Sequence, residues 1–509
     1  MFEEERVTSA RVIADASFAI GEIDRRLFGT FVEHIGRCVY GGIYEPDHPD
    51  ADEHGLRRDV IALTRELGVT LVRYPGGNFL SGYNWEDGVG PVEKRPRRLD
   101  LAWFSTEPNS FGTNEFMDWC KATGVEPLFC VNLGTRGPDD ARRLVEYTNH
   151  PGGTELSDLR HAHGYPEPHN IKLWGLGNEQ DGPWQIGEKT AYEYGRIAKE
   201  TAKLMRWVDP DVQLSASGSS GREMKSFASW EYEVLDQCYE QVDFLSLHQY
   251  FTNWDGDHAE FLGAADLMDR YIKEVVAVCD AVGAKHRSSN KIMLSFDEYN
   301  VWWKARPGGK LPKLKGWPVG PAFNEEIYNF EDALVLGGAM IALLNNADRV
   351  KIACLAQLVN VIAPIMTEPG GKAWRQPIFF PFADVANLAR GVTLRQAVTS
   401  ETFATRTLGE VDYLLSSTTL DAEAKRICVF ALNRHMSEPM DLSVELRGLP
   451  AALQMVETRT LAGHALDAVN SAAGEPVHPL PHEGAAVDGG RLSATLQPAS
   501  WNVFVLSYA

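Results

Sequence analysis

The chain has 509 residues, of which 44% are hydrophobic and 23% charged, a composition typical of a globular protein. Its formal net charge is −21, from 49 Lys and Arg against 70 Asp and Glu, which disfavours nucleic acids and anionic membrane surfaces as partners. We therefore expect a neutral or cationic ligand, no nucleic-acid partner, no membrane partner, and two domains of which one is large.

The N-terminus reads MFEEERVTSARVIAD, with acidic side chains where a secretory signal would carry Lys or Arg. No segment approaches the ~20 uninterrupted apolar residues that cross a bilayer. The 7 cysteines are dispersed and form no CxxC pair, which favours free thiols in a reducing compartment over a structural zinc site. We expect a soluble cytoplasmic protein with no metal and no cofactor.

The first segment of the fold, residues 6–20, alternates apolar and polar side chains as a half-buried strand does. From there to about residue 390, short β-branched runs alternate with helical stretches, the pattern of parallel strands covered by helices. The runs predicted as strands are 27–33, 69–74, 126–132, 171–176, 212–216, 242–247, 292–296 and 350–355. Eight is the strand number of the closed α/β barrel.

Between these runs, apolar residues three and four positions apart predict amphipathic helices. Gly68, Gly124 and Gly283 are expected to close three helices or the turns after them, where a left-handed residue is needed. The Pro-, Gly- and Lys-rich stretch 304–321 reads as a long ordered loop. After Gly391, short alternating segments predict an antiparallel sandwich.

The predicted fold is thus α/β, with a (β/α)8 TIM barrel and a C-terminal antiparallel β-sandwich. We place the barrel at residues 21–390 and the sandwich at 391–509. The strand segment 1–20 is expected to join the sandwich, so that the chain ends meet.

Two glutamates are placed where a barrel carries its active site, at the carboxyl ends of strands. Glu179 follows the fourth run in the sequence GNE, and Glu298 follows the seventh in DEYN. Glycoside hydrolysis needs one protonated carboxyl to donate to the leaving oxygen and one ionised carboxyl to attack the anomeric carbon. A single such pair would equally fit a solvated loop or a helix N-cap. Strict alternation would turn Asp297 away from Glu298, toward the barrel wall.

Other strand ends are equally polar, and their convergence on one rim indicates a hydroxyl-rich ligand. They carry Glu33, His34, Arg73, Asn132, His248, Gln249, Tyr250, Gln357 and Asn360. Gly76 and Gly77 would let the backbone approach that ligand closely. Aromatic residues in the same connections offer stacking faces for sugar rings: Tyr83, Trp85, Trp103, Trp184, Trp302 and Trp303. Trp174, inside a strand, is expected in the core.

Three other functions fit parts of this pattern. The same strand ends serve endo-β-glucanases and β-xylosidases. A metal-dependent barrel hydrolase or isomerase would need a His/Asp/Glu cluster, and no HxH or HExxH spacing occurs at the strand ends. A non-catalytic carbohydrate-binding protein could use the aromatic rim, but would have no use for both glutamates.

Six segments in order resemble those of glycoside hydrolase family 51, the α-L-arabinofuranosidases. They are FGTFVEHIGRCVYGGIYEP, RYPGGNFLSGYNWEDGVGP, WGLGNEQDGPWQIG, SLHQY, SFDEYNVWW and KIACLAQLVNVIAPIM. By position, Glu179 resembles the family's acid/base, Glu298 its nucleophile and Asn178 the residue that bonds the sugar 2-hydroxyl. The resemblance also implies a substrate pocket formed by Glu33, Arg73, Asn78, Trp103, His248, Tyr250, Trp302 and Gln357.

The resemblance implies a retaining, exo-acting enzyme that releases terminal arabinofuranosyl residues from arabinan, arabinoxylan or their oligosaccharides. It further implies a jelly-roll C-terminal domain and a homo-oligomer, a hexamer being common among intracellular bacterial members. Gly175 stands where the family usually has Cys or another side chain, and Tyr299 replaces a frequent Trp. The loops 251–261 and 304–321 look variable, and linkage preference depends on such loops.

Overall fold

The structure, a computed structural model, describes residues 7–449 and 452–508, and its larger part is a closed barrel of parallel strands. Around the barrel the strands follow the order β10-β11-β2-β3-β6-β7-β8-β9. Their bounds are β2 (Gly29–Phe31), β3 (Leu71–Tyr74), β6 (Glu126–Val131), β7 (Leu173–Leu176), β8 (Gln213–Ala216), β9 (Phe244–Phe251), β10 (Met293–Val301) and β11 (Val350–Leu355). Each coincides with one of the predicted runs, which confirms the barrel.

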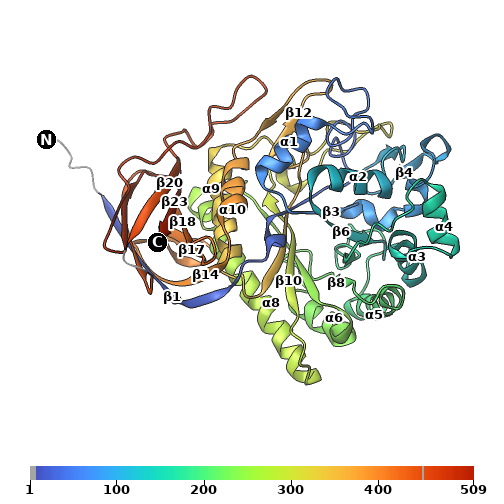
Figure 1. Cartoon of the computed structure of the whole chain (residues 1–509), viewed down its shortest axis with the longest axis horizontal. Helices are drawn as coiled ribbons and strands as arrows, with labels where there is room; N and C mark the ends of the chain where they lie inside the picture. The colour runs from blue at the N-terminus through green and yellow to red at the C-terminus, as the bar shows by residue number, and fades with distance from the viewer. Residues whose placement is uncertain (1–6, 450–451, 509) are drawn as a thin grey trace.

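Helices surround this barrel in Figure 1. They are α1 (Arg58–Leu67), α2 (Thr113–Thr123), α3 (Pro138–Asn149), α4 (Glu155–Ala162), α5 (Ala191–Val208), α6 (Ser229–Cys238), α7 (His258–Leu262), α8 (Ala264–His286), α9 (Phe330–Leu344) and α10 (Phe379–Leu388). Two small hairpins, β4 (Arg98–Asp100) with β5 (Ser105–Glu107) and β12 (Ile365–Thr367) with β13 (Ala373–Arg375), lie in the loops between barrel elements. No helix in the described ranges is both long and apolar enough to span a bilayer.

Two of the three predicted glycine stops are correct. Gly68 and Gly124 end α1 and α2 with φ of 81° and 83°, the left-handed conformation that glycine adopts without a Cβ clash. The prediction for Gly283 is wrong, because α8 continues to His286 and ends at Arg287, with φ 54°. Gly283 is instead a packing position, where a Cβ would lie 2.4 Å from the hydroxyl of Tyr239.

The strands β9 and β10 are longer than predicted and contain the polar residues expected to follow them. They run to Phe251 and Val301, so HQY and DEYN lie within the sheet. Polar side chains can continue a buried strand only if they find partners. At this end of the barrel they bond to one another, as described below.

The C-terminal part is one mostly antiparallel sheet in the order β20-β23-β18-β17-β14-β1-β19-β22-β21. Its strands are β1 (Thr8–Glu22), β14 (Val392–Thr399), β17 (Leu414–Asp421), β18 (Arg426–Asn433), β19 (Met440–Arg447), β20 (Leu453–Leu461), β21 (Ala486–Asp488), β22 (Arg491–Leu496) and β23 (Ser500–Tyr508), with the hairpin β15 (Thr402–Thr405) and β16 (Gly409–Asp412) beside them. Side chains of β22 and β23, from opposite halves of this order, share one core, so the sheet folds over on itself as a sandwich.

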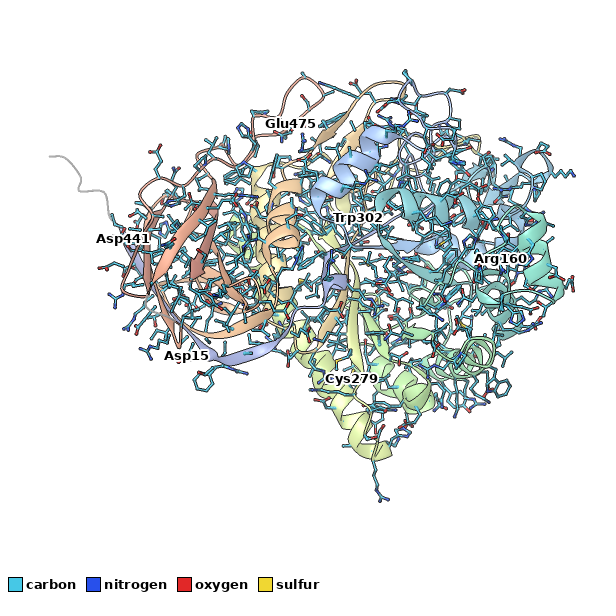
Figure 2. All side chains as sticks on the ribbon, in the orientation of Figure 1. Asp15, Arg160, Cys279, Trp302, Asp441 and Glu475 are labelled. Atoms are coloured by element: carbon cyan, nitrogen blue, oxygen red, sulfur yellow. The ribbon has the colours of Figure 1, made fainter. Side chains whose placement is uncertain are left out.

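The strand β1 belongs to this sheet although it precedes the barrel in the chain. It pairs antiparallel with β14 and parallel with β19. Figure 1 shows β1 in blue among the red strands, and in Figure 2 its Asp15 lies in the same region as Asp441 of β19. Three strands separate β1 from β23, so the first and last described strands share a sheet but do not pair. We propose that the N-terminal strand segment ends at residue 20 and that the barrel ends at residue 390, where the C-terminal part of the sandwich begins.

The sandwich packs directly on the barrel through alternate residues of its middle strands. In β18, Ile427 and Val429 lie in the sandwich core, whereas Cys428 and Phe430 lie in the barrel core. All of α9, on the barrel side, is buried. A Cβ on Gly337 of α9 would lie 2.7 Å from the indole of Trp501, so glycine permits this close approach.

Candidate active site

Glu179 lies at the barrel mouth, directly after β7. Its backbone is left-handed, with φ 43°, a conformation that costs a non-glycine residue about 1–3 kcal/mol and clusters at functional sites. The buried carboxylate accepts a hydrogen bond from Nδ1 of His248 at 2.9 Å and another from Nε1 of Trp184 at 2.7 Å. Trp184 itself is 52% exposed, so the acid is reached from the rim.

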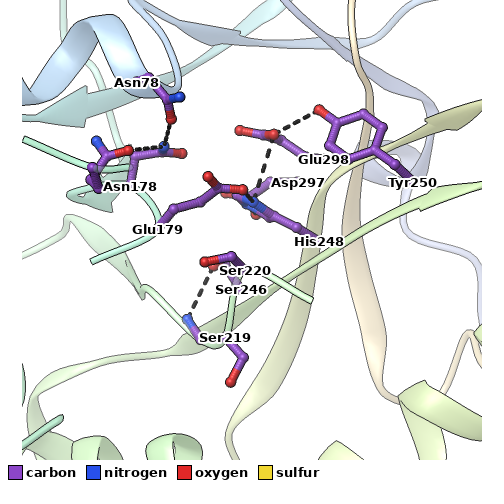
Figure 3. A network of polar contacts seen from close by, with 12 residues as sticks. Asn78, Asn178, Glu179, Ser219, Ser220, Ser246, His248, Tyr250, Asp297 and Glu298 are labelled. Atoms are coloured by element: carbon purple, nitrogen blue, oxygen red, sulfur yellow. Dashed lines mark hydrogen bonds and ion pairs between the residues drawn. The ribbon is translucent and has the colours of Figure 1, made fainter. Parts of the chain in front are cut away.

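Glu298 lies within β10 and faces Glu179 across the mouth (Figure 3). Its Oε1 accepts from Nη1 of Arg73 at 2.6 Å, and its Oε2 accepts from the hydroxyl of Tyr250 at 2.8 Å. Nδ1 of His248 is 3.6 Å from Oε2. Both carboxylate oxygens of Glu298 are thus held by donors, which fixes the orientation of this side chain.

The two glutamates are close enough to act on one sugar carbon. Glu179, His248 and Glu298 each offer one atom, and these atoms lie within 4.8 Å of one another. An oxygen of each carboxylate is thus within that distance of the other. Retaining glycosidases have carboxyls about 5–5.5 Å apart, while inverting enzymes need roughly 6.5–9.5 Å to admit a water. The spacing fits retention.

An irregularity in β10 brings Asp297 into the site, where strict alternation predicts that it turns away. Between Ser295 and Glu298, β10 uses three residues while the facing segment of β9, Ser246 to His248, uses two. Such a bulge breaks the alternation of side chains. Asp297 is buried, with Oδ1 3.2 Å from Nε2 of His248 and Oδ2 3.4 Å from Nε of Arg73.

Charges at the mouth are arranged to keep one carboxyl protonated. Burial raises the pKa of Glu179, the protonated His248 opposes that rise, and the charge of Glu298 adds to it. Burial would lower the pKa of His248, but Glu298, Asp297 and Glu179 outweigh it and raise this pKa to about 10. Despite burial, Arg73 and His248 hold the pKa of Asp297 below its ordinary value. His248 is therefore a cation at neutral pH.

Among the described residues, one cluster has ligand atoms close enough together to hold a metal ion. It consists of Glu179, His248 and Glu298. A metal-bound histidine must be neutral and must leave one ring nitrogen free for the ion. Both nitrogens of His248 are already engaged with carboxylates, and its raised pKa keeps the ring protonated. The arrangement fits an imidazolium better than a metal ligand.

A second group surrounds Glu33, which follows β2. Its Oε1 accepts from the backbone N–H of Phe79 at 2.9 Å and from Nε1 of Trp103 at 2.8 Å. Its Oε2 accepts from Nε2 of Gln357 at 3.2 Å. Burial raises the pKa of Glu33 to about 8, against the opposing effect of the Phe79 N–H.

Gly76 and Gly77 pack against the side chain of Glu33. A Cβ on Gly76 would lie 2.7 Å from Cγ of Glu33, and one on Gly77 would lie 3.0 Å from its Oε2. In the structure, the missing side chains make room for the Glu33 carboxylate.

Arg73 connects the nucleophile candidate to two asparagines. Its Nη2 donates to Oδ1 of Asn178 at 2.7 Å, and Nδ2 of Asn178 donates to Oδ1 of Asn78 at 3.3 Å (Figure 3). One guanidinium therefore fixes Glu298 and Asn178 together. This cation, from β3, thus positions one residue of β10 and one of the loop after β7.

Trp302, near the middle of the molecule in Figure 2, stands edge-on to Tyr250, with 4.8 Å between ring centroids. Its Nε1 donates to Oδ1 of Asn324 at 2.7 Å. The guanidinium of Arg306 lies 3.8 Å from the Trp302 ring centroid. Asn324 and Arg306 come from the loop after β10, and no strand pattern in the sequence marks them.

Several polar and aromatic residues expected at the rim are structural. Tyr83 and Trp85 are buried in the barrel core, as is Trp174, for which the core was the expected place. His34 bonds to Glu107 at 2.9 Å and to the hydroxyl of Tyr74 at 2.8 Å, and Nδ2 of Asn132 and Asn360 donates to backbone carbonyls. The contact network around the two glutamates includes the predicted site residues Arg73, Asn78, Asn178, His248, Tyr250 and Trp302. The second group contains the other three, Glu33, Trp103 and Gln357.

The departure at Gly175 is explained by its neighbour on β6. A Cβ at Gly175 would lie 2.7 Å from Sγ of Cys130, which already occupies the space. The other departure, Tyr299, is fully buried, and its hydroxyl lies 3.2 Å from Sδ of Met340. Neither substitution removes a group from the mouth of the barrel.

Comparisons with known proteins agree with this geometry. The models of the α-L-arabinofuranosidase 1 domain and the α-L-arabinofuranosidase C-terminal domain match residues 63–271 and 297–500. An intracellular exo-α-(1→5)-L-arabinofuranosidase of Halalkalibacterium halodurans is 52% identical over 98% of this chain and 99% of its own. An exo-α-(1→6)-L-arabinofuranosidase of Bifidobacterium longum is 48% identical over 97% of this chain and 96% of its own.

A solved structure is similar over the same length. A family 51 α-L-arabinofuranosidase from Bifidobacterium longum has a TM-score of 0.94 and 42% identity, and the match covers 99% of this chain and 100% of that one. Fold, paired carboxylates and whole-length relatives lead to one conclusion. The chain belongs to glycoside hydrolase family 51, the α-L-arabinofuranosidases.

Proposed function

We propose that the chain is a retaining, exo-acting α-L-arabinofuranosidase. It would release terminal non-reducing arabinofuranosyl residues from arabinan, arabinoxylan or their oligosaccharides. The observation that carries this proposal is the spacing of Glu179 and Glu298, with oxygens within 4.8 Å. Relatives named arabinofuranosidases over nearly the whole length support the sugar, and they disfavour an endo-β-glucanase or β-xylosidase.

In the proposed first step, Glu298 attacks the anomeric carbon while Glu179 gives its proton to the departing oxygen. Arg73 and Tyr250 hold the attacking carboxylate in position through hydrogen bonds to its two oxygens. The pKa of Glu179, raised by burial, keeps its proton available. Once the covalent arabinosyl-enzyme has formed, Glu298 has lost its charge, and Glu179 acts as the base that activates water.

We assign the remaining side chains to holding the sugar. Asn178, fixed by Arg73, would bond the 2-hydroxyl beside the nucleophile. The group of Glu33, Trp103 and Gln357, together with Asn78, would close the pocket around the non-reducing end. A pocket closed behind one sugar unit explains exo action, because no further unit fits beyond it.

The test uses the purified protein with an aryl α-L-arabinofuranoside, α-1,5-linked arabinobiose, arabinan and arabinoxylan oligosaccharides. Proton NMR of the first product should show the α-anomer before mutarotation. A β-anomer appearing first would contradict the double displacement. A panel of aryl glucosides and xylosides should remain uncleaved, since their cleavage would favour the glucanase or xylosidase alternative.

We also propose a cytoplasmic location and a homo-oligomer, a hexamer by family resemblance. All 7 cysteines are buried and unpaired, as in a reducing compartment, and the H. halodurans relative is named intracellular. Light scattering of the purified protein gives the oligomer mass directly. The same substrate panel tests the linkage preference, because relatives of similar identity are named for 1→5 and for 1→6 bonds.

A further inference from the structure

The loop after β10 places a cation on the aromatic wall of the active site. The Cζ atom of Arg306 is 3.8 Å from the ring centroid of Trp302, 5.4 Å from that of Trp254 and 5.9 Å from that of Tyr250. Cation–π contacts of this kind are strongest with Trp. The Nε of Arg306 donates to the carbonyl of Trp302 at 2.9 Å, which fixes the plane of the guanidinium.

Arg306 has aromatic contacts but no counter-ion. In the part of the chain that the structure describes, no carboxylate is within ion-pair distance of Arg306, and its two Nη groups have no hydrogen-bond partner. They are not among the unpaired nitrogens sealed from solvent. By contrast, the buried arginines Arg57, Arg73 and Arg434 are each paired with a carboxylate. Four N–H bonds of Arg306 are therefore free to meet a ligand.

The position of this cation relative to the reaction is fixed by its neighbours. Tyr250, under Arg306, bonds the nucleophile candidate Glu298. Trp254, whose ring also lies beside the guanidinium of Arg306, is exposed, so this part of the aromatic wall lies toward solvent. In an exo-acting enzyme the terminal sugar is held at the buried carboxylates, and the departing part of the substrate extends toward solvent. Arg306 therefore lies on the path of the departing part.

We propose that Arg306 is a specificity-determining residue that binds hydroxyl oxygens of the departing sugar. This inference rests on the proposed arabinofuranosidase function. The planar fork of a guanidinium can donate to two neighbouring hydroxyls at once, which an ammonium cannot. Trp254, 46% exposed beside Arg306, extends the surface outward for a further sugar unit.

The experiment compares two substrates with different leaving groups. The leaving group of 4-nitrophenyl α-L-arabinofuranoside is a nitrophenol, which has no sugar hydroxyls for Arg306 to bind. The leaving group of α-1,5-arabinobiose is a second arabinose, which has them. In Arg306→Met the contact with Trp302 is kept and the donors are lost. A charge-assisted hydrogen bond corresponds to roughly a tenfold to hundredfold effect, so kcat/KM for arabinobiose should fall by that factor relative to the aryl substrate. Arg306→Lys should recover part of this ratio.

The matched control is Lys304→Met in the same loop. Lys304 pairs with Asp332 and lies 5.3 Å from the ring centroid of Trp303, away from the mouth, so the substrate ratio should stay at the wild-type value. An independent readout is transfer of arabinose from the aryl substrate to added arabinobiose instead of water. Arg306→Met should lower this transfer, because the acceptor occupies the place of the leaving sugar.

Equal losses on both substrates, or no loss on either, would overturn the assignment. If Arg306→Met fails to fold, Arg306→Lys decides, and an unchanged substrate ratio in that variant rejects the proposal. Failure of the wild type to cleave the aryl arabinofuranoside would instead reject the proposed function. The two failures are therefore distinguishable.

Discussion

Replacing His248 with Asn removes a positive charge from the barrel mouth and keeps a neutral donor near the position of Nδ1. In the native protein, burial raises the pKa of Glu179, while the protonated imidazole 2.9 Å away opposes the rise. Loss of the charge therefore raises this pKa further. Hydrogen bonds to charged groups are worth about 1.5–3 kcal/mol and neutral ones about 0.5–1.5. The difference of about 1.4 kcal/mol corresponds to about one pH unit.

The assay is the pH profile of kcat/KM with arabinobiose, whose leaving group needs the proton. Activity falls as pH rises through the pKa of the general acid, so a higher pKa moves the alkaline limb upward by about one pH unit. His464→Asn, in the sandwich domain, is the control and should leave the limb in place. An unmoved or lowered alkaline limb in His248→Asn would refute the proposed effect of the imidazolium on Glu179.

Three further variants test the site and the core. Glu298→Ala should abolish turnover, and near-normal kcat in steady-state assays would reject its role as nucleophile. Glu179→Ala should slow arabinobiose hydrolysis by about 10²–10⁴ and spare the first step with the nitrophenyl substrate, with azide restoring product release as an arabinosyl azide detectable by mass spectrometry. Gly175→Ala should lower the free energy of unfolding by about 1–3 kcal/mol in denaturant titrations, because its Cβ meets Sγ of Cys130 at 2.7 Å. Adding Cys130→Ala should recover most of that loss, and no recovery would mean that the contact is not the cause.

The barrel could be predicted from the sequence because its strands are buried on both faces and read as short apolar runs. The positions of Glu179 and Glu298 follow from the same pattern, since strand ends define the mouth. Asp297 could not be placed, because one extra residue in β10 reverses the side on which its side chain lies. The pattern of alternation contains no sign of such a bulge.

Other differences arise from contacts between distant segments. Gly76 is read from sequence as a ligand-facing turn, whereas it accommodates Glu33, 43 positions earlier in the chain. Gly283 has the local signature of a helix stop, yet packing against Tyr239 lets α8 continue. Arg306 has no local signal, because its position depends on three aromatic side chains, one in β9 and two in the loops after β9 and β10.

The helix α9 is buried around its whole circumference and connects β10, which carries Glu298, to β11. One side of it faces the barrel, and the other is covered by alternate side chains of β18 and β23. Separation of the two domains would expose this helix to water. Melting of the sandwich and loss of the nucleophile's scaffold should therefore be one cooperative event, visible as a single calorimetric peak that coincides with inactivation.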